Sequence, residues 1–156
     1  MSNTNEWYKN AVVYQIWPRS FCDGNGDGIG DLEGVLSKLD YLQDLGINCI
    51  WFSPLYPSPN ADFGYDIADY RNIHKEYGNL DLFKQVLDGA HKRGMKVIMD
   101  LVVNHTSSAN DWFYETKEYL QQLGDKEPNV KDCKYLDYYN FTKEYEEGYT
   151  QIKDTD

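Results

Sequence analysis

The stretch Asp100-Leu101-Val102-Val103-Asn104-His105 carries the most information about how this chain folds. An apolar, partly β-branched run stands between a carboxylate and an amide–imidazole pair, which is typical of a buried parallel strand whose end opens into a polar site. We expect this strand to span residues 96–103 (KVIMDLVV). The sequence therefore predicts that chemistry-bearing side chains lie at the end of this strand.

Two further apolar runs precede that strand. Residues 11–17 (AVVYQIW) and 47–52 (INCIWF) predict short buried strands, separated from each other and from the third strand by helical patterns. The order strand, helix, strand, helix, strand predicts a parallel α/β sheet with right-handed crossovers. Such a sheet is expected to be covered on both faces, with ligand sites at the carboxyl ends of its strands.

Three amphipathic segments predict helices. Residues 31–45 have apolar side chains at helical spacing, with Asp31 placed to cap the start and Gly46 to end the helix. A second helix is expected over residues 79–93 and a third over residues 111–123. The tail that follows is rich in Tyr, Asp, Glu and Lys and has no convincing core pattern.

An acidic glycine loop (DGNGDGIGD, residues 23–31) follows the first strand. Side-chain oxygens stand at relative positions one, three, five and nine, with Gly28 at six and the Ile29 carbonyl at seven, which is the first part of a calcium-binding loop. Position twelve is Gly34 rather than glutamate, so the loop is not a complete EF-hand. The sequence favours a Ca²⁺ site here, with an ordinary acidic turn and helix cap as the alternative.

Two other polar clusters follow the second and third strands, and all three clusters are expected to share one rim of the sheet. Tyr65 beside Asp66 places a ring face next to a hydroxyl acceptor, the minimal pairing for holding a sugar. Asp100 and His105 together suit the hydrogen bonding of neighbouring hydroxyls on a polyol. Each of these side chains is also compatible with a purely structural role.

Composition narrows the partners and the compartment. The 156 residues carry a formal net charge of −11, which argues against nucleic acid or an anionic membrane as a partner. Aromatic residues make up 15% of the chain, and such rings pack well against sugars. Three cysteines suit neither a disulfide framework nor a zinc cluster, and no apolar run has the length of a signal or membrane segment. The sequence therefore predicts a cytoplasmic protein.

Taken together, these segments resemble the α-amylase family of glycoside hydrolases (family 13, clan H), which are retaining enzymes built on a TIM (β/α)8 barrel. The resemblance covers residues 12–107, through VYQIWPRSF, DGNGDGIGDLEGV, LGINCIWFSPLYPSP, GYDIADY and HKRGMKVIMDLVVNH, in the family's order and spacing. It implies that residues 1–105 form the N-terminal portion of the catalytic barrel, about three βα units. Residues 106–156 would then begin the domain inserted between strand three and helix three.

The resemblance also implies roles for individual residues. Tyr65 would stack on the glucosyl ring at the cleaved bond, and Asp66 and His105 would hydrogen-bond its hydroxyls. Asp100 would support the catalytic centre. Asp62 stands where exo-acting relatives grip the non-reducing end, although Phe63 departs from their usual asparagine. The implied Ca²⁺ ligands are Asp23, Asn25, Asp27, the Ile29 carbonyl and Asp31, with Asn104 orienting local structure or serving a second calcium.

The activity that the resemblance implies is hydrolysis of α-glucosidic bonds in carbohydrate metabolism, with α-glucan or malto-oligosaccharide as substrate. The Tyr-rich tail favours an amylase-like enzyme acting on α-1,4-glucans, and an exo-acting α-glucosidase or oligo-1,6-glucosidase is the alternative. The family's nucleophile and acid/base follow strands four and five, so no catalytic residue is expected within residues 1–156 and the chain alone is expected to be inactive. A non-catalytic sugar- and calcium-binding fragment, or an inactive truncated product, is the alternative from another class.

Overall fold

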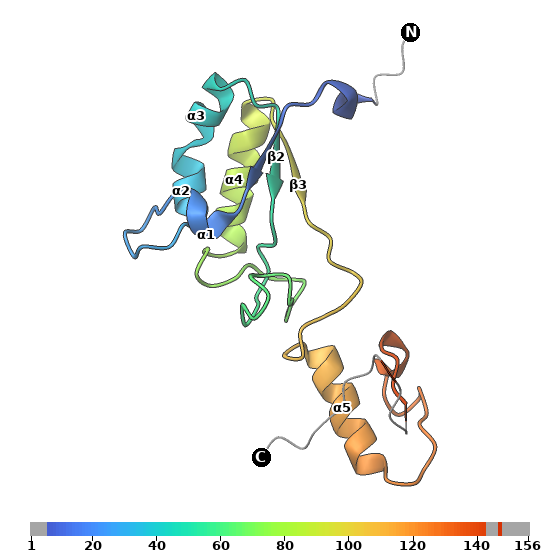
Figure 1. Cartoon of the computed structure of the whole chain (residues 1–156). Coiled ribbons are helices and arrows are strands. Elements are labelled where there is room, and N and C mark those ends of the chain that lie inside the picture. The colour runs from blue at the N-terminus through green and yellow to red at the C-terminus, as the bar shows by residue number, and fades with distance from the viewer. Residues whose placement is uncertain (1–5, 143–146, 148–156) are drawn as a thin grey trace.

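The computed structural model describes residues 6–142 and residue 147. Three parallel strands form one sheet in the order β1 (Val13–Ile16), β2 (Cys49–Phe52) and β3 (Lys96–Met99). Figure 1 shows the helices α2, α3 and α4 on one side of this sheet, with α5 set apart from it beyond β3. The helices are α1 (Pro18–Phe21), α2 (Leu32–Ser37), α3 (Leu39–Asp44), α4 (Leu80–Lys92) and α5 (Asp111–Leu123), with short 3-10 turns η1 (Trp7–Asn10) and η2 (Leu136–Tyr138). The expected order of alternating strands and helices is therefore confirmed.

The hydrophobic core lies between the sheet and its helices. Two rows of side chains across the sheet face the helices, because the strand register aligns Tyr14, Ile50 and Val97 in one row and Ile16, Phe52 and Met99 in the next. All six belong to the core or pack against it. The helices contribute fully buried apolar side chains at helical spacing, namely Leu32, Val35, Leu39, Leu42, Val86 and Ala90.

The opposite face of the sheet differs from the prediction that both faces are covered. Val13 and Gln15 of β1 and Ile98 of β3 point to that face and are exposed. Among residues 6–142 and 147, helices pack against one face of the sheet only, so these side chains meet no second layer. Buried parallel strands usually carry apolar residues on both faces. The three strand sequences are largely apolar on both faces, although in the described residues one face of the sheet is left uncovered.

The third strand is shorter than predicted. It ends at Met99, although the Asp100 amide still donates to the Phe52 carbonyl across 3.2 Å. Beyond it, Leu101 and Val103 are 73% and 75% exposed, so the apolar run continues into an extended segment that does not pair. In the part of the chain that the structure describes, β3 is an edge strand, and a strand needs a hydrogen-bonded neighbour to persist.

The helix ends follow the predicted capping, but the first predicted helix is divided. Oδ1 of Asp31 accepts the Gly34 amide at 2.7 Å and caps α2, and Asn79 caps α4 in the same way. The segment over residues 31–45 breaks at Lys38, whose amide closes a tighter turn onto the Val35 carbonyl. The predicted boundaries of α5 are confirmed. In the described residues, no helix is both long and apolar enough to cross a membrane.

Candidate sugar-binding site

The segment after β2 folds into a turn that holds a carboxylate. The Tyr65 amide donates to the Asp62 carbonyl at 2.9 Å, and Gly64 inside this turn has a φ of +100°, which a glycine adopts without strain. The Asp66 carboxylate accepts three hydrogen bonds, from the Ser58 hydroxyl at 2.6 Å and from the amides of Ala61 and Asp62 at 3.0 and 3.1 Å. These contacts fix the orientation of Asp66 at the carboxyl end of the sheet.

The charge of Asp66 is also set by these contacts. Partial burial opposes ionisation, but the Ser58 hydroxyl and the backbone amides of Asp62 and Ala61 outweigh it and hold the pKa of Asp66 below its ordinary value. A general acid needs a raised pKa so that it keeps its proton near neutral pH. Asp66 is therefore suited to accept hydrogen bonds as an anion and unsuited to donate a proton.

Asp100 connects the two loops that follow β2 and β3. Its Oδ1 accepts the indole N–H of Trp51 at 2.6 Å, and its Oδ2 accepts the Tyr65 hydroxyl at 2.8 Å. Burial first, and the negative Asp100 second, raise the pKa of Tyr65, so the phenol stays protonated and donates. The Tyr56 hydroxyl lies 3.4 Å from the Asp100 carbonyl. Asp100 thus orients the Tyr65 side chain.

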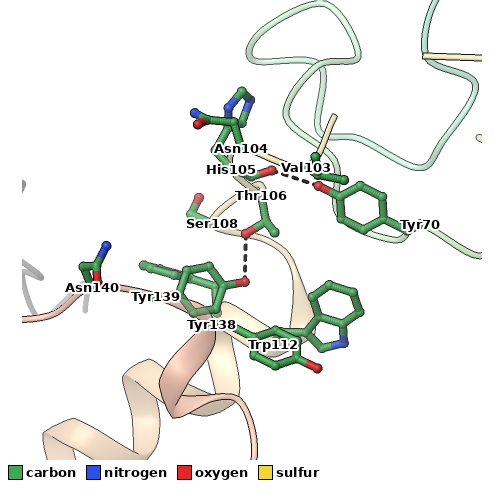
Figure 2. Close-up of a pocket in the computed structure, with 11 residues that line it drawn as sticks. Tyr70, Val103, Asn104, His105, Thr106, Ser108, Trp112, Tyr138, Tyr139 and Asn140 are labelled. Carbon is green, nitrogen blue, oxygen red and sulfur yellow. Dashed lines mark hydrogen bonds between the residues drawn. The ribbon is translucent and has the colours of Figure 1, made fainter. Parts of the chain in front are cut away.

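His105 completes the cluster. Its Nε2 lies 3.1 Å from the Tyr65 carbonyl, and because a carbonyl only accepts, Nε2 carries the hydrogen. The backbone around it is held by the Tyr70 hydroxyl, which lies 2.8 Å from the His105 carbonyl and 2.6 Å from the Val102 carbonyl; Figure 2 shows the contact to His105. The side chain of His105 is exposed to solvent and available to a ligand.

The structure joins three of the five residues predicted to bind substrate by hydrogen bonds, namely Tyr65, Asp100 and His105. Asp66 follows Tyr65 directly in the chain, and its carboxylate accepts a hydrogen bond from the amide of Asp62, the fifth predicted residue. Sequence reasoning missed three side chains that build the site, namely Trp51, Ser58 and Tyr70. A buried apolar run does not reveal which strand residue turns toward the site, although an indole N–H in such a strand needs an acceptor. Ser58 and Tyr70 lie in irregular segments whose sequence carries no comparable signal.

The acidic glycine loop lies near α2 and does not contact this cluster through any hydrogen bond of the described residues (Figure 1). Asp23 accepts the amides of Gly26 and Gly28 at 2.6 and 2.8 Å, and these two contacts, that of Gly28 first, lower the pKa of Asp23. Asn25 and Asp27 each accept the amide two residues further on. The loop follows β1 and α1 at the carboxyl end of the parallel sheet, the end expected for all three polar clusters, but it lies apart from the two clusters that follow β2 and β3 (Figure 1).

The metal-ligand prediction rests on oxygen donors that point into this loop's own backbone. Asp31 is 2% exposed, and its two oxygens accept the amides of Gly24, Asn25 and Gly34. Among residues 6–142 and 147, no three acidic, histidine or cysteine side chains are grouped as metal ligands would be. The loop therefore offers hard oxygen donors without a closed acidic cluster.

Asn104 lies away from the acidic loop, at an open cavity of about 760 Å³ between the segment after β3 and α5. Figure 2 shows this cavity with aromatic side chains of the tail, including Tyr138 and Tyr139, beneath the His105–Thr106 backbone. The Thr106 and Tyr139 hydroxyls are hydrogen-bonded at 2.9 Å, and the Trp112 and Tyr70 rings are stacked with centroids 5.7 Å apart. The first contact joins the tail to the loop that carries His105, and the second joins α5 to the segment between β2 and α4.

Comparison with known proteins gives a consistent result. A family model described as the alpha amylase catalytic domain matches residues 15–153. The oligo-1,6-glucosidase of Heyndrickxia coagulans is 55% identical over 134 residues, covering 86% of this chain and 22% of that enzyme. The oligo-1,6-glucosidase of Parageobacillus thermoglucosidasius is 53% identical over 133 residues, covering 85% of this chain. The chain spans 22% of the length of both of these curated relatives.

Solved structures extend the likeness to the fold. Eubacterium rectale Amy13B superposes with a TM-score of 0.88 at 46% identity, covering 93% of this chain and 28% of that protein. The trehalose-6-phosphate hydrolase (TreA) of Bacillus licheniformis superposes with a TM-score of 0.75 at 50% identity, covering 85% of this chain and 22% of that protein. The likeness to Amy13B therefore extends over most of the tail as well as the sheet.

Proposed function

The chain belongs to the alpha-amylase family, and from this premise we propose that the whole protein is a retaining glycoside hydrolase acting on α-glucosidic bonds. Within it, residues 1–105 supply the first three βα units of a (β/α)8 barrel, and residues 106–156 begin the inserted domain. The parallel three-stranded sheet with helices on one face supports the first assignment, and the separate position of α5 supports the second (Figure 1).

The observation that carries the proposal is the pair of hydrogen bonds that joins Tyr65 to Asp100 and to His105 at the carboxyl ends of β2 and β3, with Asp66 next to Tyr65 in the chain and oriented by Ser58. Tyr65 stacks on the glucosyl ring beside the cleaved bond, and Asp66 and His105 hydrogen-bond its hydroxyls. Asp100 supports them by orienting Tyr65, and Asp62 stands at the non-reducing end. An anionic acceptor, a ring face and an exposed imidazole together match the donors and the apolar face of a sugar.

The catalytic carboxyl groups lie outside the described residues in this proposal. Retaining glycosidases use two carboxyl groups about 5 Å apart, one as nucleophile and one as acid/base. Asp100 is occupied by Trp51 and Tyr65, and Asp66 by Ser58 and two amides, with its pKa lowered. Neither carboxylate is placed as nucleophile or acid, so both are assigned to binding and orientation.

As the first candidate substrate of the whole protein we propose short oligosaccharides, cleaved at their α-1,6 linkage. The curated relatives with more than half of their aligned residues identical include several oligo-1,6-glucosidases, and these support the exo-acting alternative raised by the sequence. An amylase-like action on α-1,4-glucans is the second candidate, supported by the Tyr-rich tail and by the likeness of that tail to Amy13B. Product profiles of the whole protein on isomaltose and on maltoheptaose separate the two.

For the acidic glycine loop we propose Ca²⁺ binding through Asp23, Asn25, Asp27 and the Ile29 carbonyl, with Asp31 as the fifth ligand. The donor set consists of hard oxygens, which suit calcium. Asn25 and Asp27 each accept one backbone amide and retain lone pairs for an ion. Asp23 already accepts three amides, and Asp31 is a buried helix cap, so these two carboxylates have fewer lone pairs left for an ion. Asn104 is assigned to a second calcium or to local structure.

Calorimetric titration with CaCl₂ tests this assignment. Saturable binding by the chain is expected to be lost in Asp23→Ala and kept in Glu33→Ala, whose side chain is exposed on α2. Asn104→Ala is expected to remove at most a second, weaker event. Wild-type chain that releases no heat after chelator treatment and dialysis would contradict calcium binding.

A non-catalytic sugar- and calcium-binding fragment, or an inactive truncated product, is the candidate from another class. Titration of the 156-residue chain with maltose is expected to give weak or absent binding, since the site residues account for one side of a glucosyl unit only. The cytoplasm is the proposed compartment, and it is supported by the three free thiols Cys22, Cys49 and Cys133. The proposed partner is an α-glucoside, not a nucleic acid or a membrane, in keeping with the net charge of −11.

A further inference from the structure

A buried histidine outside the sugar-binding cluster has both ring nitrogens engaged. His74 is 8% exposed and lies in the segment between β2 and α4, where its amide donates to the Leu55 carbonyl at 2.7 Å. Its Nε2 lies 3.0 Å from the Ser58 carbonyl, and its Nδ1 lies 3.2 Å from the Glu76 amide. The proposed sugar site makes no direct use of this ring.

The two contacts of His74 define one protonation state. An amide N–H only donates, so Nδ1 accepts from Glu76; a carbonyl only accepts, so Nε2 donates to Ser58. Both contacts are made only by the neutral ring with its hydrogen on Nε2. The Glu76 carboxylate lies 3.9 Å from Nδ1, but it is paired with Arg19 at 2.5 Å, and Tyr77 packs beside the ring. The Glu76 carboxylate is thus engaged by Arg19 and lies beyond hydrogen-bond distance of Nδ1.

Ser58 links His74 to Asp66 of the candidate site by hydrogen bonds. It is 8% exposed, its carbonyl is held by His74, and its hydroxyl donates to Oδ1 of Asp66 at 2.6 Å. The hydroxyl oxygen also accepts the Asn60 amide at 2.9 Å, so its single hydrogen is directed at Asp66. Asn60 has a φ of +61°, which a short polar side chain tolerates, and this conformation places its amide toward Ser58.

We propose that His74 is a positioning residue for Asp66, acting through Ser58, and that its neutral Nε2–H form fixes the direction in which the Asp66 carboxylate presents its remaining lone pairs. The contacts run from the Glu76 amide to His74, from His74 to Ser58 and from Ser58 to Asp66. The consequence for sugar recognition rests on the proposed function, whereas the positioning itself does not. Replacing His74 removes the hydrogen bond that holds the Ser58 carbonyl. Removing the Ser58 hydroxyl leaves the Asp66 carboxylate with only the backbone amides of Ala61 and Asp62 as donors.

Nuclear magnetic resonance of the full chain tests the positioning without any sugar. Long-range ¹H–¹⁵N correlation is expected to show His74 as the Nε2–H tautomer, a readout that needs no variant. Titration of the Asp66 carboxyl carbon is expected to show its acid dissociation constant lowered about tenfold in Ser58→Ala, because a hydrogen bond to a charged group is lost. The matched control is Ser37→Ala, which removes a serine hydroxyl that is hydrogen-bonded to the Gly34 carbonyl on α2. This variant is expected to leave the acid dissociation constant of Asp66 unchanged.

Two variants of His74 separate positioning from packing. His74→Phe keeps a ring but loses the donor, and it is expected to lower the Asp66 acid dissociation constant about threefold. His74→Gln keeps a donor near the position of Nε2, and it is expected to restore the wild-type value. An Nδ1–H tautomer, or equal titration of Asp66 in wild type and Ser58→Ala, would overturn the inference. If Asp66 titrates as expected but the whole protein cleaves no α-glucoside, the proposed function fails and the positioning stands.

Discussion

The Tyr65 hydroxyl donates to Oδ2 of Asp100 across 2.8 Å and joins two loops that are 35 residues apart in the chain. The same carboxylate accepts the Trp51 indole, so one side chain ties β2, the segment after it and the end of β3 together. The Tyr65–Asp100 hydrogen bond therefore contributes both to the arrangement of the candidate site and to the stability of the fold around the end of β3.

Tyr65→Phe is expected to lower the free energy of unfolding by about 1–2 kcal/mol, because it leaves Oδ2 of Asp100 without its donor. Urea denaturation measures the change. Tyr8→Phe is the control, since the Tyr8 side chain is 60% exposed and the substitution is expected to be neutral. Equal stability of Tyr65→Phe and wild type would show that the contact does not hold the loops together.

Acid titration of stability is expected to report on Asp66. The pKa of Asp66 in the folded chain lies below its ordinary value of 3.8, so its ionised contacts stabilise the fold above that pH and are lost as the pH falls through the folded value. Asp66→Asn is therefore expected to cost more stability at pH 7 than at pH 2. Denaturation of both proteins across this range measures the difference, and a constant difference between them would contradict the assigned charge state.

Gly34→Ala is expected to destabilise the chain by at least about 2 kcal/mol, because the added Cβ would lie 1.9 Å from the Cys22 carbonyl oxygen, a backbone atom. The close approach keeps the acidic glycine loop against the start of α2. Thermal denaturation compares this variant with Glu33→Ala, the exposed neighbouring position on the same helix. A Gly34→Ala protein with the melting temperature of the control would mean that the loop moves away freely.

The 156-residue chain by itself is expected to hydrolyse neither isomaltose nor maltoheptaose, since the carboxylates of Asp66 and Asp100 are held as hydrogen-bond acceptors and we assign Asp62 to the non-reducing end of the substrate. Chromatography of the sugars after prolonged incubation measures this. Release of glucose by the purified chain, abolished by Asp66→Ala, would assign catalysis to residues that we place in binding.

Sequence patterns were sufficient for the parts of the fold that depend on local interactions. The cap Asp31, the boundaries of α5 and the alternation of strands and helices along the chain all follow from spacing and side-chain chemistry. The length of β3 and the exposed sheet face did not follow, because pairing and coverage depend on neighbours that a local pattern does not specify.

The sequence predicted the residues of the candidate site but not the side chains that support them, and that these residues bind a substrate stays a prediction. Tyr65, Asp100 and His105 are joined by hydrogen bonds, since the carboxyl ends of parallel strands lie at one edge of the sheet. Trp51 and Ser58 were not predicted, because their roles arise from contacts 49 and 8 residues away in the sequence. The Ca²⁺ ligands, including Asp23 and Asn104, stay predictions.

The central claim is that the loops after β2 and β3 bind the glucosyl unit of an α-glucoside. Steady-state hydrolysis of isomaltose by the whole protein tests it most directly, comparing wild type with Asp66→Ala and with Asp81→Ala, whose side chain is 86% exposed on α4. We expect kcat/KM to fall by about 100-fold or more in Asp66→Ala, through loss of charged hydrogen bonds to the sugar, and to stay unchanged in Asp81→Ala. A folded Asp66→Ala protein that hydrolyses isomaltose and maltoheptaose as fast as wild type would contradict the claim.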